Sequence, residues 1–430
     1  MSQSPTDLRE QSSSFITSER SRRGATAVFA ALFLLLTAYM VAKYLHRDLK
    51  DAEVWYDAGR RALTGRPLVG LAHYRYPPAF AVMIAPLCLL PEPAFFFLWY
   101  LLGVALFLVS VYLAARLVTP SAAWRDLPGY RLSALLVAVL AIDNVVLGQT
   151  NLLVMALVYW TFLEVERGRE WLAGLPLAAA IAVKVFPAPL LLYFLYRRRW
   201  RAAVSAAACC VILFLLLPAP LRGFRHNYQE AFAWGARVVM PYLERGRAGD
   251  WGQHALDFGN QSLQAVAHRL LRPVDAGVQA RRRPAPLLVN VAGLSEDRVN
   301  HAVLALFALL GGSFLVACGW SGPRSSLEQA VEYSMATILL LLVSALAWTY
   351  FFVMLLLPVT TALALLRASA VGRSTRAWLL AGLWGLGVAT LLLVSAHARA
   401  LGCLFWAALI AYVGLARARW ELRRSALARP

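Results

Sequence analysis

Long apolar runs, separated by short polar or proline- and glycine-containing breaks, recur along the whole chain. Runs such as 25-45, 94-118 and 335-366 hold almost no charge, and they match or exceed the ~20 residues that a helix needs to cross a bilayer. The pattern therefore predicts an all-α integral membrane protein with about twelve transmembrane helices. They are expected near 25-45, 94-117, 131-148, 151-166, 171-184, 186-196, 201-217, 301-319, 328-346, 348-366, 377-395 and 399-416.

Basic clusters orient these helices, because loops rich in Lys and Arg stay on the cytoplasmic side. Such clusters lie at 20-23, 197-201 and 417-424. With the N-terminus inside, alternation places the loops 46-77 and 218-300 and the turns 148-151 and 184-187 on the external face. Both termini are then cytoplasmic. The short apolar segment Pro78 to Leu90 fits this parity only as a re-entrant or interfacial helix.

The expected organisation is one polytopic membrane domain, 25-417, between a disordered cytoplasmic tail, 1-24, and a basic cytoplasmic tail, 418-430. The first apolar run is interpreted as an uncleaved signal anchor. Aromatic and charged residues alternate at helical spacing in 218-300, which favours helices lying on the membrane surface. Arg281 to Arg283 in this segment do not overturn the topology, because long loops translocate largely regardless of charge.

Composition agrees with a membrane protein: 60% of the 430 residues are hydrophobic and 15% are charged, against roughly a quarter charged in soluble domains. The net charge of +19 comes from clusters between apolar runs, so it does not indicate a nucleic-acid partner. The five cysteines all lie in apolar runs and are expected to be packing residues. No motif supports a bound metal, nucleotide or other cofactor.

Carboxylates are concentrated directly after the first apolar run, where Asp48, Asp51, Glu53 and Asp57 occur among lysine and arginine. These charges are also what a solvated amphipathic helix would carry. A carboxylate at the lipid boundary is, however, well placed to act as a general base, because partial desolvation raises its pKa.

Further polar residues interrupt apolar sequence near other external helix ends. Tyr74-Arg75-Tyr76-Pro77-Pro78 predicts a rigid extended corner. Asp143, Asn144 and the turn Gly148-Gln149-Thr150-Asn151 either bond across helices or line a wet cavity. Lys184, before Phe186-Pro187, either snorkels to the interface or binds a phosphate. Asn260-Gln261-Ser262 offers sugar-binding donors, and Trp348-Thr349-Tyr350 is typical of interface anchors.

These pieces, in this order, resemble the GT-C superfamily of membrane glycosyltransferases, and specifically glycosyltransferase family 87, over nearly the whole chain. The resemblance rests on Asp51-x-x-Val54-Trp-Tyr56-x-Ala58-Gly59, Gly65 and Pro67, Tyr76-Pro77-Pro78, Gly148-Gln149-x-Asn151, Lys184-x-x-Pro187, Arg197-Arg-Arg-Trp200 and Asn260-Gln261-Ser262. The family contains mycobacterial mannosyltransferases that use polyprenyl-phosphate mannose.

The resemblance implies transfer of a hexosyl, in the first place mannosyl, residue from a polyprenyl-phosphate donor to a glycolipid or glycan hydroxyl. Transfer would occur on the external face of the plasma membrane, with inversion and with Asp51 as general base. Lys184, Arg75 and Arg269 are the candidate phosphate ligands. The candidate substrate contacts are Glu53, Tyr76, Gln149, Asn151, Asn260, Ser262, Trp348 and Tyr350.

The chain departs from the family at Trp348-Thr349-Tyr350, where similar proteins carry one or two histidines after the tryptophan. The sequence therefore indicates the family more firmly than the identity of the donor sugar, and an arabinofuranosyl donor remains an alternative to a mannosyl donor. A second class of function, a transporter or flippase of lipid-linked sugars, would also need polar groups among many spans. Its repeat symmetry is not apparent, and the polar groups collect externally. A protein acceptor is disfavoured, because the adjacent acidic pair associated with protein O-mannosyltransferases is absent. In this chain Ala52 separates Asp51 from Glu53.

Overall fold

The computed structural model describes residues 31, 34-46, 51-71, 73-245, 249-278 and 285-427. The chain divides into two units, residues 1-49 and 50-430. In the first unit an apolar helix runs from Leu34 to Leu45. The predictions for the tail 1-24, for Asp48 and for Arg281 to Arg283 lie outside the described residues.

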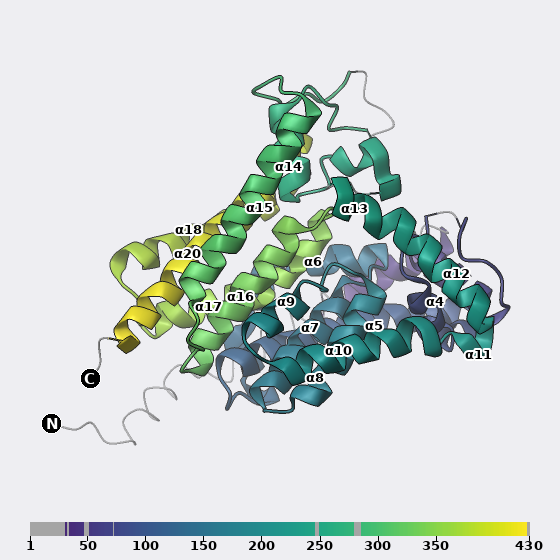
Figure 1. Cartoon of the computed structure of the whole chain (residues 1–430), viewed down its shortest axis with the longest axis horizontal. Coiled ribbons are helices and arrows are strands. Elements are labelled where there is room, and N and C mark those ends of the chain that lie inside the picture. The colour runs from purple at the N-terminus through teal and green to yellow at the C-terminus, as the bar shows by residue number, and fades with distance from the viewer. Residues whose placement is uncertain are drawn as a thin grey trace. The chain divides into compact units, whose positions relative to one another are not determined.

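All regular secondary structure among the described residues of the second unit is helical, apart from one isolated bridge between Asn260 and Trp348 (Figure 1). Its first half contains α3 (Asp51–Leu63), α4 (Pro78–Ile84), α5 (Glu92–Val118), α6 (Arg131–Leu147), α7 (Asn151–Glu166), α8 (Glu170–Val183), α9 (Leu190–Tyr196) and α10 (Trp200–Val211). Its second half contains α11 (Ala219–Arg222), α12 (Phe224–Trp234), α13 (Met240–Arg245), α14 (Leu263–Leu271), α15 (Glu296–Cys318), α16 (Ser326–Val343), the 3-10 segment η6 (Thr349–Leu355), α17 (Leu356–Arg367), α18 (Arg373–Leu391), α19 (Ala396–Ala400) and α20 (Cys403–Leu427). The expectation of an all-helical membrane protein is confirmed.

Seven helices among the described residues are long and apolar enough to cross a membrane, fewer than the twelve predicted. They are Glu92–Val118, Trp200–Arg222, Glu296–Cys318, Ser326–Val343, Thr349–Arg367, Arg373–Val394 and Cys403–Ser425. Four further predicted spans form shorter helices: α6 has 17 residues, α7 has 16, α8 has 14 and α9 has 7. The polar turn 148-151 and the prolines after Lys184 end these helices early, and a seven-residue helix is only about 10 Å long.

Ionic residues gather near the C-terminal end of α7, opposite to Asn151 at its N-terminal end. In α16, Glu332 is fully buried and accepts hydrogen bonds from Arg197 at 2.8 Å and Arg419 at 2.7 Å. Next to it, Tyr333 donates to Glu166 at 2.9 Å. Arg419 belongs to the predicted basic tail, yet it is buried, because α20 continues through Leu427 instead of ending before residue 418.

The predicted external segment 218-300 is largely helical. Figure 1 shows α12 and α13 following one another along the margin of the bundle. On α12, Phe224, Tyr228 and Phe232 are all more than half exposed, and their spacing of four residues places them on one face. This outward aromatic face is what a helix at a membrane surface would carry.

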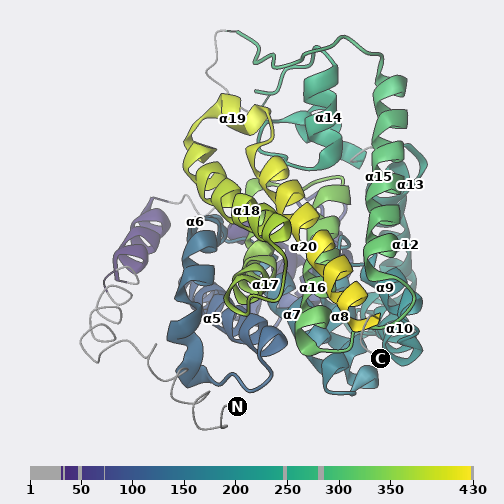
Figure 2. The same ribbon diagram turned by 90° about the vertical axis from the view of Figure 1, so that its left-hand side faces the viewer.

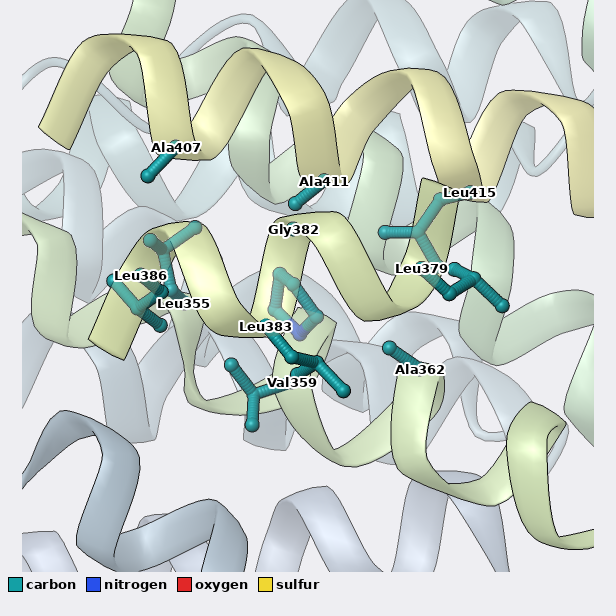
Figure 3. A pocket seen from close by; sticks show the side chains of 11 residues that line it. Leu355, Val359, Ala362, Leu379, Gly382, Leu383, Leu386, Ala407, Ala411 and Leu415 are labelled. Carbon is teal, nitrogen blue, oxygen red and sulfur yellow. The ribbon is translucent and has the colours of Figure 1, made fainter. Parts of the chain in front are cut away.

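The C-terminal helices pack closely through small residues. In Figure 2, α18 and α20 lie against each other beside α17. A Cβ atom added at Gly382 of α18 would lie 2.8 Å from the Cα of Ala411 in α20. Figure 3 shows the apolar pocket that borders this contact. It is lined by Leu355, Pro358, Val359, Ala362, Leu379, Gly382, Leu383, Leu386, Ala407, Ala411 and Leu415.

Candidate functional site

Half of the twelve predicted site residues converge, although they come from five separate segments of the chain. Side-chain contacts link six of them, which we call the polar cluster: Asp51, Tyr76, Gln149, Asn151, Lys184 and Tyr350. Asp51, Tyr76, Lys184 and Tyr350 are half-buried, whereas Gln149 and Asn151 are buried. The cluster therefore combines a fixed interior with an accessible rim.

Asp51 is the first residue of α3, so its carboxylate lies at the positive end of the helix dipole. The helix is amphipathic: its buried residues are Ala52, Trp55, Ala58, Gly59 and Ala62. This stripe seats the helix on the bundle and holds Asp51 at the boundary of the buried face. Glu53 is half-buried in the same first turn, and Asp57 is exposed.

The turn between α6 and α7 holds α3 in place. Gly148 adopts a left-handed conformation with φ of 66° and ends α6, as glycine commonly does. Its carbonyl accepts hydrogen bonds from the indole nitrogens of Trp55 at 2.8 Å and Trp99 at 2.9 Å. A Cβ atom at Gly148 would lie 2.7 Å from the Cβ of Ala52. Residues next to Asp51 and Gln149 are thus in direct contact.

Gln149 connects the acidic and basic members of the polar cluster. Its Nε2 donates to the carboxylate of Asp51. Its Oε1 accepts from Lys184 Nζ at 3.3 Å and from the Tyr76 hydroxyl at 3.4 Å. A donor directed at a carboxylate favours its ionised form.

Lys184 follows the last residue of α8 in an extended conformation. Besides Gln149, its ammonium donates to Asn151 Oδ1 at 2.7 Å. The ammonium also lies over the rings of Phe351 at 4.1 Å, Tyr76 at 5.1 Å and Tyr350 at 5.9 Å from the ring centroids. Desolvation lowers the pKa of Lys184 well below its usual value, and the nearby Asp51 carboxylate opposes this shift. Amide oxygens and aromatic faces also favour the cation.

Tyr76 lies in the corner before α4 and packs against Trp55, with ring centroids 4.3 Å apart and ring planes tilted by 60°. Burial raises the pKa of the Tyr76 phenol well above its usual value, and nearby Tyr350 adds to this effect. The phenol therefore stays protonated and able to donate. Arg75 is half-buried, and its carbonyl accepts from Trp234 Nε1 at 3.0 Å, which ties this corner to α12.

Asn260, Ser262 and Trp348 lie together at a different contact, where the segment 249-278 meets the chain before η6. The Asn260 amide donates to the carbonyls of Ala255 at 2.8 Å and Ala345 at 3.1 Å. The Ser262 hydroxyl accepts from the Ala265 amide at 3.2 Å and caps α14. Asn260 and Ser262 are fully buried, so their polar groups join segments of the backbone.

Arg269 also bonds the backbone. Its guanidinium donates to the carbonyls of Asp257 at 2.8 Å, Asn260 at 2.8 Å and Ala400 at 2.8 Å, and the side chain is fully buried. Desolvation by this burial lowers the pKa of Arg269 to about 9, against the attraction of Asp257. Arg269 and Asn260 therefore both bond backbone carbonyls where these segments meet, and neither belongs to the polar cluster.

Three further residues at the site were not among the twelve predicted site residues. Trp55 and Trp99 hold the Gly148 carbonyl, and Asn144 donates to the Tyr350 carbonyl at 2.7 Å. Asn144 had a signal in the sequence, because a buried amide in an apolar run needs partners. Trp99 had none, since its run of aromatic residues is equally typical of a lipid-facing helix.

A crevice opens beside the cluster, between α5 and the α6–α7 turn. Its polar wall consists of Asn144, Gly148 and Gln149. Its apolar wall consists of Trp99, Leu102, Gly103, Leu106, Val145, Leu152 and Leu153. No group of three or more His, Cys, Asp or Glu side chains that could hold a metal ion occurs within the part of the chain that the structure describes.

The chain is similar to known glycosyltransferases over part of its length. The chain is 34% identical over 177 residues to a polyprenol-phosphate-mannose-dependent alpha-(1-2)-phosphatidylinositol mannoside mannosyltransferase of Mycobacterium tuberculosis, covering 35% of this chain and 40% of that protein. It is 32% identical over 171 residues to the protein of the same name from Mycolicibacterium smegmatis, covering 34% and 38%. It is 30% identical over 137 residues to an alpha-(1->3)-arabinofuranosyltransferase of M. tuberculosis, covering 30% of each.

The chain thus spans well under half the length of these curated relatives. No solved structure matches it. The sequence pattern of glycosyltransferase family 87, however, matches residues 74–345, which is well over half of the chain and includes Tyr76, Gln149, Asn151 and Lys184. The chain therefore belongs to glycosyltransferase family 87.

Proposed function

We propose that this protein transfers a sugar from a polyprenyl-phosphate donor to a hydroxyl group of a glycolipid or glycan, with inversion at the anomeric carbon. The observation that carries the proposal is the bridge from the Asp51 carboxylate through Gln149 to the Lys184 ammonium. Inverting transfer requires a base on the acceptor side and a cation on the leaving-group side, and this arrangement supplies both.

In the proposed reaction the acceptor oxygen attacks the anomeric carbon, and its proton passes to Asp51. The bond between the anomeric carbon and the phosphate oxygen breaks, and both electrons leave with the polyprenyl phosphate. The amide of Gln149 orients the Asp51 carboxylate before the reaction.

Lys184 is the proposed ligand of the departing phosphate. An ammonium carries three N–H donors, and two of them go to Gln149 and Asn151. The third is available to a phosphate oxygen at the accessible rim. Arg75 stays a candidate second phosphate ligand. We assign Arg269 to the backbone instead, because carbonyl groups engage its guanidinium. Glu53, Tyr76 and Tyr350 are the proposed sugar contacts.

The crevice beside Gln149 suits a lipid-linked donor, because polar and apolar walls meet there. The proposed site faces the exterior of the plasma membrane. The buried ion network at the opposite end of α7 supports this orientation, because it includes Arg197 and Arg419 of the basic clusters expected inside. We propose no cofactor beyond the lipid-linked sugar, and we assign no metal-binding residues.

We propose mannose as the transferred sugar, since two of the relatives are named for polyprenol-phosphate-mannose. An arabinofuranosyl donor is the second candidate, supported by the relative named as an arabinofuranosyltransferase. Membership of a glycosyltransferase family supports an enzyme over a transporter or flippase.

The test is transfer by the purified protein in liposomes, with polyprenyl-phosphate mannose or arabinofuranose as donor and with glycolipid acceptors. Asp51→Asn keeps the shape of the side chain but removes the base, so kcat should fall by about 10²–10⁴. Lys184→Gln should raise the KM of the donor and leave the KM of the acceptor unchanged.

Asp57→Asn is the matched control, because Asp57 lies on the same helix and is exposed. It should transfer at the parental rate. Equal rates for Asp51→Asn and Asp57→Asn would remove Asp51 from the role of base. Sugar movement across the bilayer without any transferred product would instead support a flippase.

A further inference from the structure

Asn144, in the last turns of α6, is fully buried and is the point where the polar cluster is attached to the backbone. Its Nδ2 donates to two carbonyl oxygens, Leu140 at 2.8 Å and Tyr350 at 2.7 Å. Carbonyl oxygens only accept hydrogen bonds. The amide of Asn144 therefore has one allowed orientation, with its nitrogen toward these carbonyls.

The orientation of the Asn144 amide determines the orientation of the Asn151 amide. With Nδ2 engaged, the Oδ1 of Asn144 faces Asn151 and accepts from its Nδ2 at 2.9 Å. The Oδ1 of Asn151 must then point the other way, toward Lys184, whose ammonium lies 2.7 Å from it. An amide can usually be turned by 180° at little cost, but here two backbone carbonyls select one arrangement for both asparagines.

We propose that Asn144 is a positioning residue that sets the affinity for the donor phosphate by fixing the Asn151 oxygen toward Lys184. The inference rests on the proposed function, since it concerns the same cation. The side-chain hydrogen bonds of Asn144 go to Leu140, Tyr350 and Asn151, and Asn151 in turn bonds Lys184. The effect of Asn144 passes through Asn151, which it holds so that an oxygen, and not an NH₂ group, meets the ammonium.

The two ways of replacing Asn144 separate this role from a merely structural one. Asn144→Leu removes the acceptor of the Asn151 NH₂ group, so this buried amide loses the partner that holds its oxygen against Lys184 and should shift away from it. Asn144→Asp keeps an acceptor for the Asn151 NH₂ group, but places a carboxylate against the carbonyls of Leu140 and Tyr350. The Asp variant should be the less stable, yet it should retain the orientation of Asn151.

The measurement is the Kd of polyprenyl phosphate for the purified full chain in nanodiscs, together with the melting temperature of each variant. Asn144→Leu should weaken binding roughly ten-fold, the scale of losing one hydrogen bond to a charged group. Asn144→Asp should bind close to the parental Kd despite a lower melting temperature. In a Lys184→Met background, Asn144→Leu should have no further effect on Kd, because the residue it acts through is absent.

Asn227→Leu is the matched control, because Asn227 is another fully buried asparagine, and its amide donates to the Phe214 carbonyl at 2.8 Å. It should lower stability and leave the Kd unchanged. The inference is overturned if the Kd of the Asn144 variants follows their stability, if Asn144→Leu still weakens binding in the Lys184→Met background, or if the parent does not bind polyprenyl phosphate. Binding without sugar transfer would contradict the proposed function alone.

Discussion

Gly148→Ala should inactivate the site while leaving most of the fold intact. Gly148 has φ of 66°, and a Cβ atom there would lie 2.7 Å from the Ala52 Cβ and 3.1 Å from the Ala52 backbone nitrogen. The change therefore has two separate costs. One is backbone strain at Gly148, and the other is displacement of the first turn of α3.

The two costs differ in what they affect. A left-handed conformation costs an alanine roughly 1–2 kcal/mol, which lowers stability. Carbon atoms normally pack at ~3.5–4.0 Å, so α3 has to move by about 1 Å. Asp51 adjoins Ala52 and would move with it, away from Gln149. A misplacement of about 1 Å at a reacting group can cost ~100-fold in rate, so kcat should fall by about that factor.

Gly168→Ala is the matched control for the strain alone. Gly168 has φ of 73° just after α7, and an added Cβ would meet nothing within 4 Å. Both variants should lose similar stability in thermal unfolding followed in detergent, but only Gly148→Ala should lose the proposed sugar transfer. Equal kcat in the two variants would refute the reasoning that the Gly148 turn positions Asp51.

Three further substitutions test contacts outside the cluster. Glu332→Ala leaves Arg419 and Arg197 without the carboxylate that they share, so the free energy of unfolding should fall by about 3–5 kcal/mol. An unchanged melting temperature in detergent would disprove this. Arg269→Met should make the segment 249-278 sensitive to protease without changing the KM of the donor; a raised KM would restore Arg269 as a phosphate ligand. Gly382→Ala should lower the melting temperature, because its Cβ would meet the Ala411 Cα at 2.8 Å, and a higher melting temperature would show that α18 and α20 have room to separate.

The sequence predicted the membrane class and half of the candidate site for one reason. Charged and amide side chains are expensive in lipid, so Gln149, Asn151 and Lys184 stand out against apolar runs. The same argument fails in a polar segment. Asn260 and Arg269 lie among many polar residues, and only their contacts show that backbone carbonyls engage them.

The span count is the part of the fold prediction that is not confirmed. Apolarity marks a segment as buried, but it does not distinguish lipid from protein as the surroundings. The apolar stretches around the polar turn 148-151 and after Lys184 form helices too short for independent spans. Their apolar residues are buried largely by neighbouring helices, as the fully buried Val154, Val158 and Phe162 of α7 illustrate.

The sequence alone therefore determined that the chain is a helical membrane protein, and which polar residues need an explanation, because hydrophobicity and the cost of burying polar groups are properties of single residues. Only the tertiary structure decided which of them meet. Asp51 and Lys184 lie more than 130 positions apart, and Gln149 bridges them only because the Gly148 turn packs on Ala52. The direction of each amide in the cluster likewise depends on the Tyr350 carbonyl, which the chain supplies from its last third.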